Sequence, residues 1–141
     1  MASQNFSKLT ERLASYFGTG TFKAMLVTAV PSETELDTWA VRSDVTSEHA
    51  ANGTYVTGGF AVTAAVGALD SANNRIPVTF SAANPTYSNG TITGAVGLVI
   101  YKVVGSASTD EVVTFVDFGA AKSVTGGDFT VTFSTPLYIN R

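Results

Sequence analysis

Residues 92–104 read ITGAVGLVIYKVV, and this stretch decides the fold. From Ala95 to Tyr101 both side-chain alternations are apolar, and only Gly97 interrupts them. A half-buried strand alternates apolar and polar residues, whereas a strand covered on both faces is a continuous apolar run. The β-branched residues and the short length favour a strand over a buried helix. The sequence therefore predicts a central strand in an all-β domain.

Apolar alternation on both sides of this stretch predicts the other strands. They cover residues 22–29, 60–69, 76–80, 112–118 and 129–137, with residues 120–125 bracketed by glycine turns at Gly119 and Gly126. Further turns are predicted at residues 70–74 (DSANN) and 88–90 (SNG). Pro77 cannot donate a ladder hydrogen bond, so its strand is expected at a sheet edge or with a bulge. Six or seven such strands indicate a mainly β fold, an antiparallel β-sandwich or jelly-roll-like barrel.

One amphipathic helix is predicted before the first strand, over residues 5–17. Its apolar residues recur at three- and four-residue spacings, and they are Phe6, Leu9, Leu13, Tyr16 and Phe17. This apolar stripe either packs on the domain's own sheet or makes the helix an arm that docks on a neighbouring subunit. The predicted organisation is an N-terminal helix or arm at residues 1–20 and a single β-sandwich domain at residues 21–141.

Residues 32–45 (SETELDTWAVRSDV) are acidic at their front and contain the single tryptophan, Trp39. The spacing from Asp37 through Trp39 to Val45 predicts a short helix or a wrapped loop capped by Asp37. An aromatic residue of this size is expected to be a buried anchor more often than a platform for a ligand.

The 141-residue chain is rich in apolar residues and poor in charge. Hydrophobic residues make up 45% and charged residues 13%, against a usual charged share of about 25%. A composition of this kind excludes a disordered chain, and a charge-poor surface is typical of proteins that are partly covered in an assembly. The net charge of -3 and the pI near 4.9 predict no nucleic-acid partner and no anionic membrane partner.

The chain contains no cysteine, so disulfides and thiol chemistry are excluded. Its first residues lack the basic-then-apolar order of a signal peptide, and no apolar run approaches bilayer length. We therefore expect synthesis in a cytoplasm.

Residues that could carry catalysis or bind a metal are few. His49 is the single histidine, and Asp44 and Glu48 are near it in a polar stretch that has no nucleophile elbow. Asp70, Asn73 and Asn74 offer oxygen atoms, but their spacing is that of a turn and not of a calcium-binding loop. The sequence therefore predicts no enzyme, no cofactor and no metal site.

Two other features remain open. Asp117 lies among apolar residues and is expected to be exposed, or paired with Lys102 or Lys122. Tyr55, Tyr87 and Tyr138 either line a sugar-binding face or pack in the core and its rim.

Five segments, taken in order, resemble a group of small virion proteins of tailed bacteriophages. They are the N-terminal helix followed by FKAMLVT, then DTWAVRSDVTSE, GTYVTGGFAVT, TITGAVGLVIYK and VDFGAAKSVTGGDFTVTFSTP. The resemblance covers most of the chain. It implies a β-rich capsid decoration (cement) protein, an oligomer that binds over gaps between capsid subunits. A tail, fibre or host-receptor-binding module is the alternative, because β modules of similar appearance serve both roles.

The expected partners are the major capsid protein and further copies of the chain, with a homotrimer on a threefold axis as the expected oligomer. The expected location is the outer surface of the capsid in the virion. Apolar and aromatic residues in the helix, in the tryptophan segment and near the C-terminus are the candidate interface residues. They are Phe6, Leu9, Leu13, Phe17, Trp39 and Tyr138.

Overall fold

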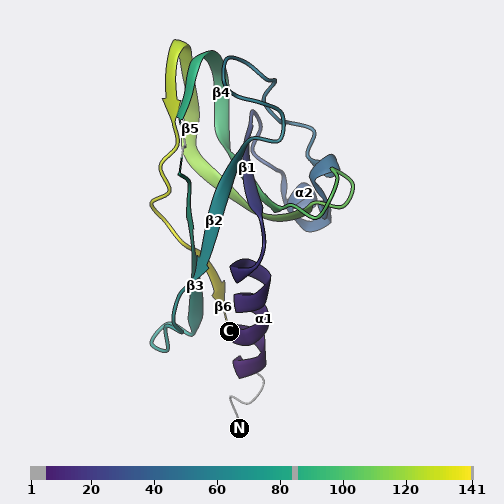
Figure 1. Ribbon diagram of the computed structural model, residues 1–141, viewed down its shortest axis with the longest axis vertical. Helices are drawn as coiled ribbons and strands as arrows, with labels where there is room; N and C mark the ends of the chain where they lie inside the picture. Colours follow the sequence, from purple (N-terminus) through teal and green to yellow (C-terminus); the bar gives the residue numbers. More distant parts are fainter. Residues whose placement is uncertain (1–5, 84–85, 141) are drawn as a thin grey trace. The chain divides into compact units, whose positions relative to one another are not determined.

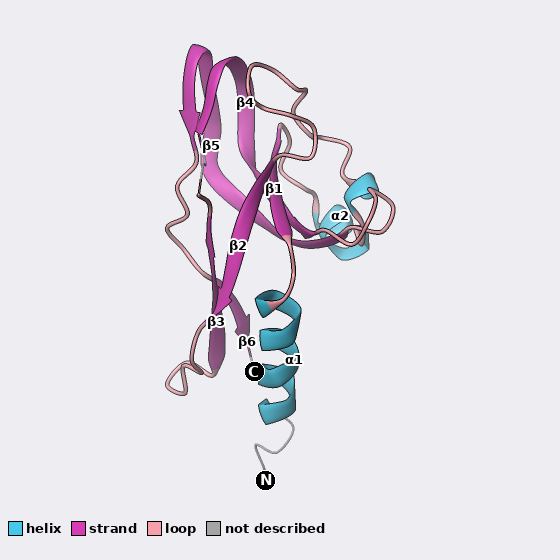
Figure 2. Cartoon of the chain, viewed as in Figure 1, coloured by secondary structure: helices cyan, strands magenta, loops and turns pink. Residues whose placement is uncertain are grey.

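A computed structural model describes residues 6–83 and 86–140, with side chains for residues 12–83 and 86–139. Strands make up most of it (Figures 1 and 2). The elements are α1 (Phe6–Gly18), β1 (Phe22–Val27), α2 (Glu33–Thr38), a 3₁₀ helix (Arg42–Asp44), β2 (Phe60–Val66), β3 (Arg75–Ser81), β4 (Thr86–Lys102), β5 (Glu111–Thr130) and β6 (Leu137–Asn140).

Hydrogen bonds join the strands in the order β5-β4-β1-β2-β3-β6, and every pair is antiparallel. The prediction of a mainly β, antiparallel fold with an N-terminal helix is therefore confirmed. The sandwich or jelly-roll arrangement stays a prediction.

The chain divides into two compact units. Of the described residues, the first unit holds 6–20, 63–81 and 133–140, and the second holds 21–62, 82–83 and 86–132. Residues 63–81 and 133–140 thus group with the N-terminal helix. The predicted division at residue 20 places them with the other strands instead. The prediction of one sandwich domain over residues 21–141 is not tested by this grouping.

The predicted central strand is β4, an interior strand of the second unit. It pairs with β1 on one side and β5 on the other, and residues 97–101 are buried without a break. The strand is longer at its start than predicted and ends at Lys102. Gly97 is required inside it, because a Cβ there would overlap the Val116 carbonyl oxygen and the Phe115 ring. The interruption in the apolar run is therefore a place where a neighbouring ring lies against bare backbone.

The predicted glycine turns within residues 118–127 are wrong, because β5 continues through them. Gly119 and Gly126 have positive φ (72° and 61°) and lie where the register between β4 and β5 shifts. Asn89, predicted in a turn, lies inside β4 with a φ of 56° beside another shift. Left-handed residues can absorb an extra residue in one strand as a bulge, so turn-type residues here bend one long hairpin without ending it.

The predicted last strand, residues 129–137, is also wrong. β5 ends at Thr130, whose partner Thr86 is the first residue of β4, and residues 131–136 belong to no strand. Phe129 and Val131 are buried, as the alternation predicts. The alternation here reflects burial, but no described strand pairs with residues 131–136, so they form no ladder.

Pro77 lies in an interior strand, which corrects the prediction of an edge or a bulge. β3 pairs with β2 on one side and with β6 on the other. The β2–β3 ladder ends at Val66 and Val78, and beyond it the Pro77 carbonyl oxygen accepts a hydrogen bond from the Gly67 N–H (2.8 Å). The missing proline donor therefore falls at the end of a ladder, where it costs little.

Candidate protein-binding surface

Helix α2 begins at a capping box and not at the predicted Asp37 cap. The Ser32 hydroxyl accepts the Glu35 N–H (3.3 Å), and the Glu35 carboxylate accepts the Ser32 N–H (2.7 Å). The hydrogen bonds from Ser32 lower the pKa of Glu35. Asp37 lies inside the helix, because Ser-x-x-Glu supplies the first possible cap. The helix leaves Leu36 half exposed, with 53% of its surface accessible.

A second carboxylate fixes the chain just after α2. Asp44 accepts hydrogen bonds from the N–H groups of Ala40 (2.9 Å) and Val41 (3.0 Å), which lower its pKa. Trp39 donates its backbone N–H to the Glu35 carbonyl oxygen (2.8 Å), and its side chain is half buried against the core. Trp39 therefore has a fixed backbone position although it lies at the surface.

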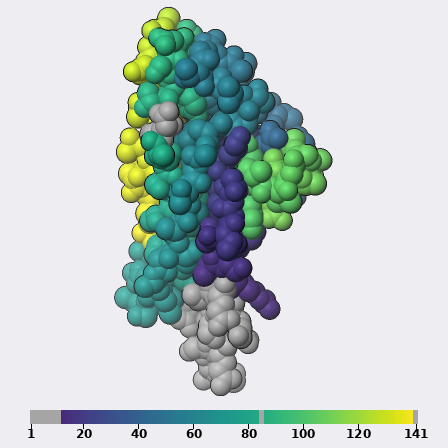
Figure 3. Space-filling model, viewed as in Figure 1, coloured from purple at the N-terminus to yellow at the C-terminus, as the bar shows by residue number. Residues whose placement is uncertain are grey.

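A buried ion pair holds the loop between β4 and β5. Asp110 is 3% exposed and accepts the N–H groups of Val104 (2.9 Å) and Gly105 (3.1 Å) and the Arg42 Nε–H (3.0 Å). Burial raises the pKa of Asp110, but these hydrogen bonds outweigh it and the net shift is downward. Arg42 also lies over the Tyr101 ring, 5.2 Å from its centroid. Figure 3 shows this loop and the start of β5 as a green projection.

An apolar groove of about 160 Å³ lies between α2 and β5. Its lining residues are mostly apolar, and they are Pro31, Leu36, Trp39, Val99, Val112, Val113, Thr114 and Phe115. Below it is a buried cluster formed by Met25, Val27, Val45, Val99 and Tyr101. We call this feature the α2–β5 groove. It is an opening onto the core, and the half-exposed Leu36 lies at its mouth.

One wall of the groove belongs to an edge strand. Among the strands that the structure describes, β4 alone pairs with β5. At the start of β5 the segment after Trp39 covers the outer edge, since Val41 bridges to Glu111 and the Val112 N–H donates to the Ala40 carbonyl oxygen (3.0 Å). Beyond Val112, no strand within residues 6–83 and 86–140 pairs with that edge. Edges of this kind accept a strand from another chain.

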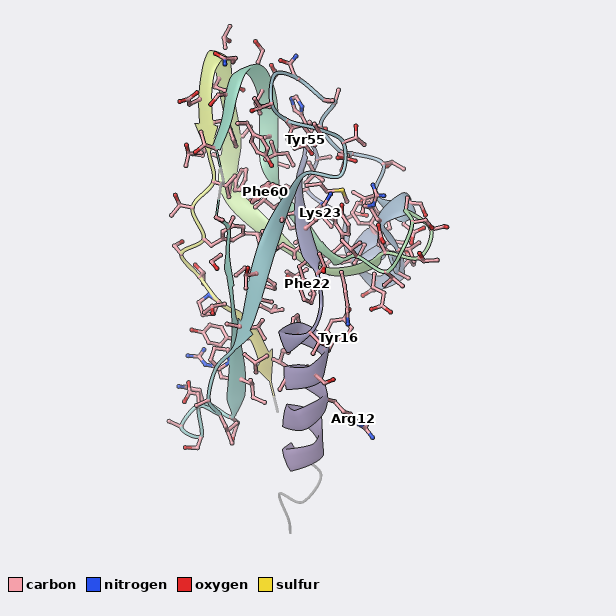
Figure 4. The ribbon with its side chains drawn as sticks, in the orientation of Figure 1. Arg12, Tyr16, Phe22, Lys23, Tyr55 and Phe60 are labelled. Carbon is pink, nitrogen blue, oxygen red and sulfur yellow. The ribbon has the colours of Figure 1, made fainter. Side chains whose placement is uncertain are left out.

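A cluster of hydrogen-bonded polar groups joins the loop before β2 to β1 in the same unit. The Tyr55 hydroxyl donates to Glu48 Oε1 (3.1 Å) and accepts the Leu26 N–H (3.1 Å), and Gly58 donates its N–H to the same carboxylate oxygen. The Tyr101 hydroxyl donates to the Gly58 carbonyl oxygen (2.6 Å). We call Glu48, Tyr55, Gly58 and Tyr101 the Glu48 cluster. Figure 4 labels Tyr55 on the loop that precedes β2.

Burial dominates the titration of these tyrosines. It raises the pKa of Tyr55, which the negative charge of Glu48 raises further. Burial also raises the pKa of Tyr101, to about 12, against the opposing effect of Arg42. Both hydroxyls thus stay protonated as donors at neutral pH.

The structure does not assemble Asp44, Glu48 and His49 into one site. The Thr93 N–H donates to His49 Nε2 (3.1 Å), so Nδ1 carries the proton and donates to the Ala50 carbonyl oxygen (2.7 Å). Asp44 and Glu48 accept separate backbone N–H groups. Each of the three groups therefore holds a different loop in place.

Asp70 belongs to a turn, as predicted. It accepts hydrogen bonds from the Asn73 backbone N–H (3.2 Å) and side chain (2.9 Å) and from Arg75 Nε (3.1 Å). Those bonds, first from the Asn73 side chain and then from Arg75, lower the pKa of Asp70. The residues described in the structure contain no group of three His, Cys, Asp or Glu that could hold a metal ion.

Asp117 is exposed, and it accepts the Gly119 N–H (2.7 Å).

A second hollow, of about 630 Å³, lies elsewhere on the second unit. Hydroxyl-bearing and aromatic residues contribute to its lining, which consists of Thr54, Val56, Gly59, Phe60, Ala61, Ala83, Thr86, Tyr87 and Ser88. The Tyr87 hydroxyl is buried and has no hydrogen-bond partner in the described part of the chain. Its ring contacts Phe60 and Tyr55 edge to face, with centroids 5.4 and 4.9 Å apart.

The candidate interface residues are distributed over both units. The side chains of Phe6 and Leu9 lie outside the described residues. Leu13 is half buried, whereas Phe17 is buried and packs edge to face on Phe80, with centroids 6.3 Å apart. Phe17 therefore packs within its own unit, while Arg12 of the same helix points outward (Figure 4).

Of the remaining two candidates, Trp39 lines the α2–β5 groove and Tyr138 is exposed. The guanidinium of Arg75 stacks over the Tyr138 ring, with Cζ 3.8 Å from the ring centroid. Trp39 is thus the one candidate that the groove includes.

Sequence reasoning missed the other groove residues. Leu36 is an isolated leucine between acidic residues, and this pattern could have predicted an exposed apolar side chain. Val112, Val113 and Phe115 were assigned to a strand, but the sequence does not reveal which strand lies at an edge. That property depends on the pairing order.

No protein-family model matches this chain, and no curated protein or solved structure is significantly similar to it. Among the described residues there is no helix with the length and apolar character needed to span a membrane.

Proposed function

We propose that the protein is a capsid decoration (cement) protein of a tailed bacteriophage, which binds the outer surface of the head lattice and bridges capsid subunits. The supporting observation is the α2–β5 groove beside an edge strand, because an apolar opening next to unpaired backbone is suited to bind another polypeptide. The five-segment resemblance gives that partner its identity as the major capsid protein. The proposal includes a sandwich or jelly-roll closure of the sheet.

Stabilisation in this proposal follows from mass action. A protein that binds the intact lattice and not its disrupted form makes disruption break its contacts as well. A homotrimer on a threefold axis would make several such contacts at once, so that each can be weak while the whole binds tightly. The proposal assigns the protein no catalytic step, nucleic acid, membrane or cofactor.

Copy number in purified virions tests the proposal. Quantitative mass spectrometry against the major capsid protein is expected to give about one copy per capsid subunit, since each lattice site repeats. A handful of copies per particle would contradict a role over the whole lattice.

The second hollow favours an alternative function, that of a tail, fibre or host-receptor-binding module. Hydroxyl groups beside ring edges, around a space of about 630 Å³, suit a sugar ring. This alternative predicts few copies per virion and binding to glycans from the host surface. Thr86→Val should weaken such binding while leaving attachment through the groove unchanged. A virion that carries many copies and binds no glycan would contradict the alternative.

A further inference from the structure

Backbone groups along the outer edge of β5 point away from β4 at alternate residues. The Val103 N–H donates to the Thr21 carbonyl oxygen (2.8 Å), so odd-numbered residues at this end of β4 direct their backbone groups toward β1. Even-numbered residues of β4 then face β5, and Thr114 is paired opposite one of them. Phe115 and Asp117 are opposite odd-numbered residues, so their N–H and C=O groups point outward.

Phe115 also belongs to the wall of the α2–β5 groove, so the outward backbone and the apolar opening meet at this residue. A strand that bonds to Phe115 and Asp117 would place every second side chain over the groove. The segment after Trp39 already occupies the edge at Val112, and a new strand would continue along the edge from there.

The charge of α2 limits what can bind there. Its sequence, ETELDT, carries three carboxylates and no basic residue. Glu33 lies one turn before Leu36 and one turn before Asp37, so the two carboxylates lie together along the side of α2 next to the Leu36 side chain. The side chains of Glu33 and Asp37 make no hydrogen bond or ion pair with the described residues, whereas that of Glu35 is used in the capping box. A partner side chain at this rim is favoured when it is positive.

We propose that the α2–β5 groove binds an extended segment of a partner protein, which adds as a strand to β5 at Phe115 and Asp117, inserts an apolar side chain between Leu36 and Phe115, and places a lysine or arginine against Glu33 and Asp37. Because only alternate side chains of a strand share a face, the partner chemistry is an extended chain with an apolar and a basic residue two positions apart, so that both face the groove. This inference rests on the proposed function only in assigning the groove to a protein partner.

A second copy of the chain suits this edge less well. Two-fold pairing of β5 with itself through its outward-facing residues would be centred on Val116 and would place Asp117 of the second copy opposite Phe115, on the groove side of the sheet. That carboxylate would lie beside the acidic α2, where a negative side chain is disfavoured. We therefore assign the edge to a different polypeptide with basic residues.

Trp39 makes the test direct, because it is the single tryptophan and lines the groove. The probe is an acetylated peptide of about ten residues in which every second residue is threonine and the residues between are valine and lysine in turn, so that valine and lysine share one face; it is titrated into the purified full chain. We expect a blue shift of Trp39 fluorescence and binding about tenfold tighter than that of the matched valine–glutamate peptide. The double change Glu33→Gln with Asp37→Asn should remove that preference, and Leu36→Ser should weaken binding of both peptides.

Amide hydrogen exchange tests strand addition separately. With the lysine peptide bound, the Phe115 and Asp117 amides should exchange more slowly, whereas the Thr114 amide, already bonded to β4, should change little. A peptide N-methylated at alternate residues on its bonding edge should not bind, because it lacks the donors of a ladder. Equal binding of the methylated peptide, or equal binding of the glutamate peptide, would overturn the inference.

Two other outcomes would also overturn it. One is the absence of any Trp39 response to the peptides. The other is a Trp39 shift that depends on the concentration of the chain alone and accompanies dimers in sedimentation, because a second copy would then fill the groove. The assay contains no virions, so the inference can fail while virion copy number still supports the proposed function, and the reverse also holds.

Discussion

The Glu48 cluster and the α2–β5 groove lie in the same unit and differ in how their groups are satisfied. In the cluster, a carboxylate, two hydroxyls, two backbone N–H groups and a backbone carbonyl oxygen form hydrogen bonds inside the protein. In the groove, apolar side chains remain accessible, and the edge strand has backbone groups that no described strand pairs with. The first arrangement stabilises the fold, and the second leaves surface that a partner can cover.

This difference predicts that substitutions in the two regions separate stability from binding. Changes around the Glu48 cluster should lower the free energy of unfolding by large amounts. Changes at the groove should leave that free energy nearly constant and reduce attachment to a partner.

Gly59→Ala should have the largest effect on stability. Gly59 has a φ of 70°, and a Cβ there would overlap the Ala24 carbonyl oxygen, so the loop could not lie against β1. We expect a loss of more than about 3 kcal/mol in the free energy of unfolding, measured by urea titration. Gly105→Ala is the matched control, because a Cβ there meets its nearest neighbour at 3.7 Å. Similar losses for both variants would contradict the account.

Glu48→Ala should be the next most damaging change. It leaves the Tyr55 hydroxyl and the Gly58 N–H buried without their acceptor, which should cost about 3 kcal/mol. Glu48→Gln keeps a carbonyl oxygen at that place and should cost about 1 kcal/mol. Urea midpoints of the two variants check this order, and a reversed order would show that the cluster does not depend on an acceptor at Glu48.

High pH should destabilise the Glu48 cluster by ionising its tyrosines. Burial raises the pKa of Tyr101 to about 12 and raises that of Tyr55 as well. Because an unfolded tyrosine ionises near pH 10, the stability from the protonated hydroxyl is full below about pH 10. It is lost as the pH rises through the folded value, at about 1.4 kcal/mol per pH unit for each tyrosine.

Urea midpoints measured between about pH 8 and 12 should therefore fall above pH 10. Tyr101→Phe removes one ionising group and should make that fall shallower. A variant with the same pH slope as the unchanged chain would show that Tyr101 titrates as it does in the unfolded state.

Leu36→Ser should have the smallest effect on stability. Leu36 is 53% exposed, so we expect a change of no more than about 1 kcal/mol, measured by urea titration. The same variant should bind the valine–lysine peptide more weakly. A large loss of stability would mean that Leu36 is part of the core and that the groove is not a free surface.

The β4 strand shows what the sequence can predict. Its continuous apolar run correctly indicated burial on both faces, because side-chain chemistry directly reflects the environment of each face. The amphipathic spacing of residues 5–17 likewise predicted α1 within one residue at each end. Local patterns of this kind need no knowledge of which strands become neighbours.

The errors came from properties that depend on pairing. Gly119 and Gly126 are residues typical of turns, but they form bulges because β5 stays paired with β4 on both sides of each glycine. Residues 131–136 alternate like a strand but lack one to pair with. The groove depends on the same property, since Phe115 is a binding candidate only because β5 is an edge strand.

Attachment of the purified protein to capsids that lack it is the most direct test of the central claim. Cosedimentation should show that the unchanged chain binds the capsids and that Leu36→Lys binds them at least about tenfold more weakly. Leu69→Lys is the matched control, since Leu69 is also exposed (41%) and does not line the groove, and it should bind normally. Equal binding of all three proteins, or no binding of the unchanged chain, would contradict the account.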